Sequence, residues 1–566
     1  MAAGAWVVLW ALVVADRCLW ANVSQWREDA GTNLWLGYST WLHHAVPPVG
    51  LLSSKHVPNP NGMPLVSTLL SLLPSLFWVS LACSLAQAAA ILWASYELSR
   101  GARWVRLSLA LPPLACVFLR AASIELWNQW LFITINGLLI ALVARELRKH
   151  HPLHYLLIAW LILLSPSLYL MGVLNGLLFG MALCGLVVHQ RKQIDWRRPA
   201  TQLCVGLIFL GTLASAYLTW LPYLRTLSFA QLTDLPSAPL SERAKNAWQA
   251  IKQTRKWIFD VHPPDLAAIW QSHGTINGPE VQQYAEITAR IFEFQLWVAG
   301  LALLTALGYA LWQRRLPLRL TPLWLLLGLL AAYAGSPLLG GFPWHEGERA
   351  DQSLTFLIWL FWAAFSVPLL GRALGKLRGV ITLASVSLAF AYTGVAAWCG
   401  VSAAWAHLIY RGTIVSVADV PLVHKEAALA FIARDWRAHS ESDRVPLHYD
   451  MVGEWSWIPV HGELMLKYLP APVFTVGRAL DWELLRRFQL HNLHEGEQKR
   501  DFQDDRYVMT YAGKRIPKYV PEHAEHHLFG RIRVSVVEQH LSQKNEGKRS
   551  ARKPKGAQMA QAESAA

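Results

Sequence analysis

A series of long apolar blocks separated by short polar segments constrains this chain more than any other feature. Most blocks approach 20 residues, about the length at which a helix crosses the hydrocarbon core of a bilayer. In hydrocarbon every backbone N–H and C=O needs a partner within the protein, so blocks of this length form helices. The sequence therefore predicts an α-helical polytopic membrane protein. We expect about eleven transmembrane helices, near residues 4–22, 77–98, 105–120, 129–146, 153–169, 171–189, 201–222, 292–312, 321–339, 353–371 and 379–400.

Composition supports the membrane class and argues against an ordinary soluble enzyme. Charged residues make up 16% of the 566 residues, below the quarter or so that is typical of soluble domains. Hydrophobic residues make up 54%, and many of the 29 tryptophans fall at block edges, where indole rings favour the membrane interface. The first block lacks the charged start and the small-residue cleavage site of a signal peptide, so we expect it to remain as an anchor.

The distribution of basic residues predicts the orientation. With a cytoplasmic N-terminus, the inner connecting segments hold sixteen Arg or Lys residues, whereas the short outer segments hold four. This asymmetry follows the positive-inside rule. It also accounts for much of the net charge of +14, so nucleic-acid binding is not needed to explain that charge. The inner residues are Arg100, Arg103, Arg106, Arg145, Arg148, Lys149, Arg191, Lys192, Arg197, Arg198, Arg314, Arg315, Arg319, Arg372, Lys376 and Arg378; the outer ones are Arg27, Lys55, Arg120 and Arg349.

Three long outer segments complete the expected organisation. A transmembrane module covers residues 1–400 and carries a long first outer loop, 23–76, and a second one, 223–291. Residues 401–545 form a small extracytoplasmic α/β domain, in which EAALAFIARDW has helical spacing and RVPLHYDMV, RYVMTYAG and RIRVSVVEQ are typical of strands. Residues 546–566 form a basic tail without aromatic residues, which predicts disorder.

The first outer loop contains most of the residues that could carry chemistry. Glu28 and Asp29 follow the first span within the stretch SQWREDAGTN, and the turn PNPNG precedes an amphipathic segment, MPLVSTLLSLLP. Aromatic residues recur at three-residue spacing, as in a helix that lies along the membrane surface. The loop also holds His43, His44, Lys55 and His56. These features predict a short helix, a turn and a re-entrant helix with carboxylates at the mouth.

The spacing of these residues in the sequence, taken alone, favours solvated or interfacial side chains over catalytic ones. Acidic residues beside a membrane are commonly solvated, and they contribute little to topology. Paired histidines such as His43 and His44 more often lie at the interface than bind a metal, and no partner close in sequence completes a metal site. Ionisable residues inside an apolar block, such as Asp16 and Arg17, are costly and neutralise each other or face a polar cavity.

Two motifs resemble a known family. A first helix that ends in an outer acidic pair, a proline-rich turn and a PLxxxLLxL helix are similar to the C-type (GT-C) membrane glycosyltransferases. The likeness is to the branch of the protein O-mannosyltransferases, the aminoarabinose lipid A transferase and the rhizobial galacturonosyltransferases. Here the acidic pair reads Glu28-Asp29 followed by Ala30, where the family usually has Asp-Glu or a single Asp. In GFPWHEGERADQS, Arg349 matches an outer-loop Arg of the family, and Ala350 replaces its usual Tyr.

The resemblance implies an inverting glycosyltransferase that moves a hexose or pentose from a polyprenyl-phosphate donor to a glycan, lipid or protein acceptor. Asp29 would be the general base, and Glu28 would orient the acceptor or assist a divalent cation such as Mg²⁺ or Mn²⁺; the metal requirement is unknown. Arg349, with Arg120, Lys55 and His345, would hold the donor phosphate. The histidines of the first loop, His43, His44 and His56, would contact the acceptor. We expect the location to be a bacterial inner membrane, with the N-terminus cytoplasmic and the C-terminal domain extracytoplasmic.

Three other functions remain open at the level of sequence. A transporter or flippase would show related halves and charges at the bilayer midplane, and no internal repeat is visible. An O-antigen ligase or polymerase would place its key Arg and His residues in a large late loop. The 223–291 loop, with Arg243 and His262 among its basic residues, keeps that alternative open. A non-enzymatic membrane protein with an outer binding domain is the third.

Overall fold

The computed structural model divides the chain into two compact units. One comprises Met1–Val423 with Trp455–Lys467, and the other comprises His424–Glu454 with Tyr468–Ala566. The structure describes residues 2–24, 28–44, 46–50, 59–99, 102–116, 119–120, 123–124, 126, 128–169, 172–226, 239–245, 375–408, 421–439, 449–451, 507–512, 515–516, 520–530 and 532–537, together with residues 248, 297, 301, 304, 308, 325 and 328.

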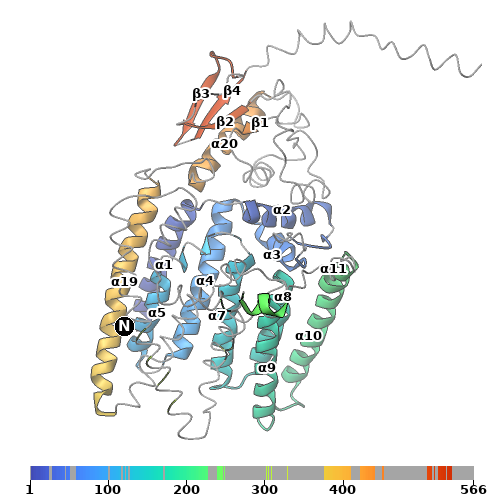
Figure 1. The fold of residues 1–566 in the computed structure, drawn as a ribbon, viewed down its shortest axis with the longest axis vertical. Helices are drawn as coiled ribbons and strands as arrows, with labels where there is room; N and C mark the ends of the chain where they lie inside the picture. Colours follow the sequence, from blue (N-terminus) through green and yellow to red (C-terminus); the bar gives the residue numbers. More distant parts are fainter. Residues whose placement is uncertain are drawn as a thin grey trace, which may run out of the picture. The chain divides into compact units, whose positions relative to one another are not determined.

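The first unit is helical wherever it is described in regular structure (Figure 1). Four of its helical segments are long and apolar enough to cross a membrane, namely Leu76–Leu98, Gly172–Gln190, Pro199–Thr226 and Arg378–Ser402. The helices are α1 (Ala2–Asn22), α2 (Glu28–His43), α3 (Gly62–Leu70), α4 (Leu76–Leu98), α5 (Arg103–Ala115), α7 (Asn128–Glu146), α8 (Pro152–Leu168), α9 (Gly172–Gln190), α10 (Pro199–Ser215), a π-helical turn (Ala216–Trp220), α11 (Leu221–Thr226), a 3-10 turn (Gly375–Leu377) and α19 (Arg378–Leu408).

These helices coincide with eight of the eleven predicted spans. The other three, near 292–312, 321–339 and 353–371, lie almost wholly outside the described residues, so the total of eleven stays a prediction. Helix α19 ends at Leu408, beyond the predicted boundary at 400, because the following residues are rich in alanine and still favour a helix. The chain is thus a predominantly helical membrane protein.

Helix α4 lies at the centre of the first unit. It packs against α1, α5 and α7, while α19 packs against α1 and α5, and α8 packs against α7, α9 and α10. About 56% of the α4 span is buried, compared with 6% of the span Pro199–Thr226. Small residues permit the close packing of α4. A Cβ atom placed on Gly137 of α7 would lie 3.1 Å from the Cβ of Ala90.

The two helices predicted for the first outer loop are present. Helix α2 includes the aromatic residues at three-residue spacing, and α3 follows the proline-rich turn. The two helices pack on each other closely, since a side chain at Gly37 would overlap the backbone of Ser67. His44 follows the end of α2 with a φ of 52°, the left-handed conformation that commonly terminates a helix.

The second unit contains a four-stranded sheet. Its strands are β1 (Tyr449–Met451), β2 (Tyr507–Tyr511), β3 (Glu525–Phe529) and β4 (Ile532–Val536), in the order β1-β2-β4-β3. β1 is parallel to β2, and the other pairs are antiparallel. Most of α20 (Leu422–His439) belongs to this unit, where the Tyr507 hydroxyl donates to Asp435 over 2.6 Å. The helix and three of the strands confirm their sequence predictions, whereas the domain limits at 401 and 545 stay predictions and the tail 546–566 lies outside the described residues.

Candidate functional site

The end of α1 and the start of α2 are joined to residues 114–126 by hydrogen bonds. The Ser24 hydroxyl donates to the carbonyl of Ile124 over 3.2 Å, and the Asn33 amide donates to the carbonyl of Leu126 over 3.2 Å. Ser24 and Asn33 are both fully buried. These contacts bridge more than ninety positions of sequence, so they hold the start of α2 in place against the rest of the first unit.

Helix α2 begins with the predicted catalytic carboxylates, Glu28 and Asp29. Position 29 lies one helical turn before Asn33, the residue that ties α2 to Leu126. The first N–H groups of a helix lack backbone acceptors and, with the helix dipole, favour a negative charge at this end. The backbone at 28 and 29 is therefore suited to ionised carboxylates, and the orientation of the two side chains lies outside what the structure describes.

Two buried arginines, Arg17 and Arg120, form a cluster with Asp16 of α1, whose side chain is 21% exposed. Arg120 Nη1 donates to Asp16 Oδ1 over 2.6 Å, its Nη2 donates to the carbonyl of Ala396 on α19, and its guanidinium lies over the Trp20 ring. Arg17 Nη2 donates to the carbonyl of Leu114 over 3.1 Å. Both arginines are 1% exposed.

This cluster holds more N–H donors than acceptors. The Nε atom of Arg120 and the Nε and Nη1 atoms of Arg17 have no hydrogen-bond acceptor among the described residues, although Arg17 Nη1 lies 3.7 Å from Asp16. Within the described part of the chain, two guanidinium groups face a single carboxylate here, which leaves a net positive charge. A buried donor without an acceptor is unfavourable, so this corner of the protein favours an anion nearby.

An apolar cavity of about 250 Å³ lies between α3, α8 and the α10 segment. Gly62 and Leu65 of α3 line it on one side, and Trp160 of α8 lines it on another. The π-helical turn Ala216–Trp220 contributes Leu218 and Thr219. Such turns inside α-helices are frequent at functional sites.

Asn61, which precedes α3, connects this cavity to the first outer loop. Its amide nitrogen donates to the carbonyl of Pro47 over 2.8 Å and to the carbonyl of Leu218 in the π-helical turn over 2.9 Å. Asn61 is 1% exposed. Neither Asn61 nor Asn33 was singled out from sequence. An asparagine beside an apolar helix was the available signal, but its carbonyl partners lie far away in sequence.

The predicted site residues are not all described. Helix α2 ends at His43, whose side chain is outside the description, and His44 is exposed. Arg120 is buried as set out above. Lys55, His56, His345 and Arg349 lie outside the described residues, so their approach to Asp29 stays a prediction. Among the residues that the structure describes, no group of three or more His, Cys, Asp or Glu side chains could hold a metal ion.

A second set of buried charges lies at the C-terminal ends of α4 and α7. Glu97 accepts from Arg145 Nη1 over 3.0 Å and from the Trp93 indole over 3.1 Å, and it pairs with Arg148. Glu97 and Glu146 were not singled out from sequence. They lie among basic residues of the segments that the sequence predicts to be inner ones, where a carboxylate is an expected counter-charge.

Glu146 is surrounded by histidines. Its two carboxylate oxygens accept from His150 Nδ1 over 2.6 Å and from His154 Nδ1 over 2.7 Å, and its Oε2 also accepts from the backbone N–H of His151. The side chain of Glu146 is fully buried. His150, His151 and His154 therefore all contact this one carboxylate.

The chain is therefore a polytopic membrane protein whose first unit contains the anchored helix α2, the pair of buried arginines Arg17 and Arg120, and an apolar cavity. No family model and no curated protein match it. It is similar to the crystal structure of ArnT from Cupriavidus metallidurans bound to undecaprenyl phosphate, with a TM-score of 0.43 and 13% identity over 94% of this chain and 98% of that one. It is also similar to the crystal structure of ArnT from Cupriavidus metallidurans in the apo state, with a TM-score of 0.36 and 16% identity over 95% and 98%.

Proposed function

We propose that this protein is a membrane glycosyltransferase that moves a sugar from a polyprenyl-phosphate donor to an acceptor on the extracytoplasmic side. The observation that carries the proposal is the carboxylate pair at the start of α2, in the unit that also holds the excess of buried guanidinium groups. The sequence resemblance to the GT-C glycosyltransferases supports the same chemistry.

In the proposed reaction Asp29 acts as the general base. It accepts the proton of an acceptor hydroxyl, whose oxygen attacks the anomeric carbon as the bond from that carbon to the phosphate oxygen breaks. One displacement of this kind inverts the anomeric configuration. The hydrogen bond from Asn33 to Leu126 supports the assignment, because it anchors α2 one turn after position 29 and so limits the movement of the base.

The departing lipid phosphate requires positive charge. Arg349, Lys55 and His345 are proposed to contact it, and the corner of Arg17 and Arg120 supplies a fixed net positive charge near the start of α2. Arg120 lies four residues before Ile124, whose carbonyl holds Ser24. Preorganised cations stabilise the charge that develops on a leaving group, and this is usually the largest electrostatic contribution to such a reaction.

The polyprenyl chain is proposed to enter the apolar cavity beside α3. Its lining by Leu65, Trp160 and Leu218 suits an isoprenoid, and the cavity adjoins the span Pro199–Thr226, which is largely exposed to lipid. Along α2, about 12 Å separate position 29 from Gly37, where α3 crosses. A reaction at the membrane surface and a lipid tail within the bilayer are compatible with this spacing.

The remaining predicted residues have supporting roles. Glu28 is proposed to orient the acceptor or to assist a divalent cation, and His43, His44 and His56 are proposed to contact the acceptor. The second unit would guide that acceptor towards the membrane.

The first experiment compares glycolipids and glycans from cells that lack this protein with those from cells that express wild-type or Asp29→Asn protein, by mass spectrometry. We expect deletion to remove a sugar modification and the Asp29→Asn variant to lower its restoration by about 10²- to 10⁴-fold, the usual contribution of a general base. Glu28→Gln is the matched control and should retain more activity.

The same assay separates the proposed function from an O-antigen ligase or polymerase. If Asp29→Asn protein restores the glycan while changes at Arg243 or His262 abolish it, the assignment of the base to α2 is wrong. The amounts of each variant in the membrane must be equal, measured by immunoblotting, so that loss of protein is not mistaken for loss of catalysis.

A further inference from the structure

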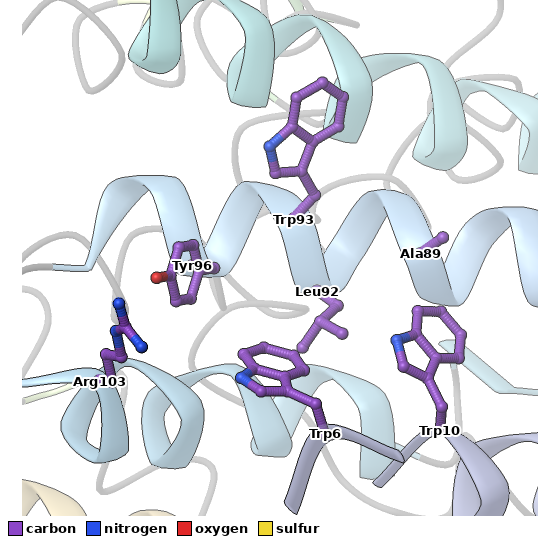
Figure 2. Close-up of a pocket in the computed structure, with 7 residues that line it drawn as sticks. All are labelled: Trp6, Trp10, Ala89, Leu92, Trp93, Tyr96 and Arg103. Carbon is purple, nitrogen blue, oxygen red and sulfur yellow. The ribbon is translucent and has the colours of Figure 1, made fainter. Parts of the chain in front are cut away.

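A second cavity, of about 530 Å³, lies at the other end of α1 (Figure 2). Aromatic rings form most of its wall: Trp6 and Trp10 of α1 and Trp93 and Tyr96 of α4. Ala89 and Leu92 of α4 and Arg103 of α5 complete the lining. Along the axis of α1, Trp6 lies about 27 Å from the level of Ser24. This cavity is therefore separate from the proposed transferase site.

The aromatic wall is held by interactions outside the cavity. The Trp93 indole donates to Glu97, which the two arginines Arg145 and Arg148 hold in turn. Trp6 meets Tyr96 edge to face, with 5.9 Å between ring centroids. The Arg106 guanidinium lies 5.1 Å from the centroid of the Tyr96 ring. Aromatic side chains fixed in this way form a preorganised wall, which reduces the entropy lost when a ligand binds.

The charge at the edge of the cavity is positive. Arg103 is exposed, and it forms no ion pair with an acidic residue among those that the structure describes. The Nε atom of Arg106 likewise has no hydrogen-bond acceptor among them. The described residues that line the cavity include no acidic side chain. The cavity is therefore apolar along its wall and cationic at one edge, and it suits a molecule with an apolar chain and an anionic headgroup.

We propose that this cavity binds one acyl chain of an anionic phospholipid, with the headgroup phosphate on Arg103. The aromatic wall would cover the acyl chain, and the Arg103 guanidinium would form charge-assisted hydrogen bonds with the phosphate. The position within a membrane supplies lipid at high local concentration, and a cluster of basic residues at the membrane surface attracts anionic lipids. The proposal is independent of the glycosyltransferase function.

The test uses the full chain, purified in detergent, and native mass spectrometry with added dioleoyl-phosphatidylglycerol or dioleoyl-phosphatidylcholine. We expect one phosphatidylglycerol molecule to be retained per chain, and phosphatidylcholine to be retained about tenfold less strongly, because the choline cation beside its phosphate cancels the net negative charge and is repelled by Arg103. Equal retention of the two lipids by the wild-type protein would overturn the proposed role of Arg103.

Two variants with matched controls locate the site. Ala89→Trp fills the cavity from α4 and should abolish the retained lipid, whereas Ala86→Trp, at another exposed position of the same helix, should not. Arg103→Gln should remove the preference for phosphatidylglycerol, whereas Arg191→Gln, at an exposed position outside the cavity lining, should keep it.

The control for folding is the thermal unfolding midpoint of each variant in the same detergent. If Ala89→Trp protein does not fold, the pair Arg103→Gln and Arg191→Gln still tests the proposal. If all variants retain equal amounts of lipid, the lipid binds non-specifically to the membrane-facing surface of the protein, and the proposal is wrong.

Discussion

Among its described residues, the first unit contains two clusters of buried charge, and the clusters differ in how completely the charges are paired. On α1, the single carboxylate of Asp16 forms ion pairs with both Arg17 and Arg120. At the ends of α4 and α7, each buried carboxylate receives at least two donors, from arginines and an indole at Glu97 and from histidines and a backbone N–H at Glu146.

This difference in pairing distinguishes charged residues that only stabilise the fold from charged residues that can still bind a ligand. Both carboxylate oxygens of Glu97 and of Glu146 are already engaged by donors from the chain, so these two residues are best explained as anchors of helix ends. The Arg17 and Arg120 pair keeps N–H groups that no described residue accepts. Buried ionisable groups in membrane proteins are expensive and are commonly functional when their partners are incomplete.

The largest expected effect is at Asp16. Asp16→Asn removes the carboxylate that the cluster shares and leaves two arginines, each 1% exposed, without that counter-charge. Breaking a buried ion pair in this way costs about 3 kcal/mol or more in the free energy of unfolding. Thermal unfolding in detergent, read by circular dichroism, would measure the loss. Asp195→Asn, in an exposed turn, is the control and should change the midpoint little.

A smaller effect is expected at Glu146. Glu146→Ala removes the acceptor of two imidazoles and one backbone N–H and should cost about 1–3 kcal/mol. The loss is smaller than at Asp16 because the side chains of His150 and His154 are 20% and 12% exposed and can reach water. Glu146→Gln retains one acceptor oxygen and should recover part of the stability in the same unfolding measurement. If the Glu146→Gln protein is no more stable than the Glu146→Ala protein, hydrogen bonding does not explain the role of this residue.

The smallest effect is expected at Glu97. Glu97→Gln should cost about 1 kcal/mol or less, because the side chains of Arg145 and Arg148 are 46% and 34% exposed and turn to water when the carboxylate is lost. The measurement is again the unfolding midpoint, at low and at high salt. A loss at Glu97 larger than the loss at Asp16 would reverse the distinction between the two regions.

Much of the fold could be predicted because hydrocarbon imposes a simple rule. Apolar blocks near 20 residues identified the helices of the first unit, and the spacing of Trp35, Tyr38 and Trp41 identified α2. The strand β3, EHHLF, was missed because it contains three polar residues and is largely exposed; its pairing with β4 makes it a strand. Local pattern carries little information about a strand that is defined by its neighbour.

The candidate site was predictable only in part. The carboxylates at the start of α2 follow from the order of span, acidic pair and amphipathic helix. The hydrogen bonds of Asn61 to Pro47 and Leu218 do not, because a π-helical turn 157 residues away presents the second carbonyl. No periodicity in the sequence encodes a contact between two such distant segments.

The sequence by itself determined that the chain enters a membrane, where eight of its helices lie, and that Glu28 and Asp29 begin a helix just after the first span. These properties depend on hydrophobicity and on neighbours within a few residues. Only the tertiary structure decided that Arg120 pairs with Asp16, 104 positions away, and that α1, α4 and α5 enclose an aromatic cavity beside Arg103. Such contacts arise when separate helices pack side by side, and the choice of neighbours depends on the shape of whole helix surfaces rather than on any local run of residues.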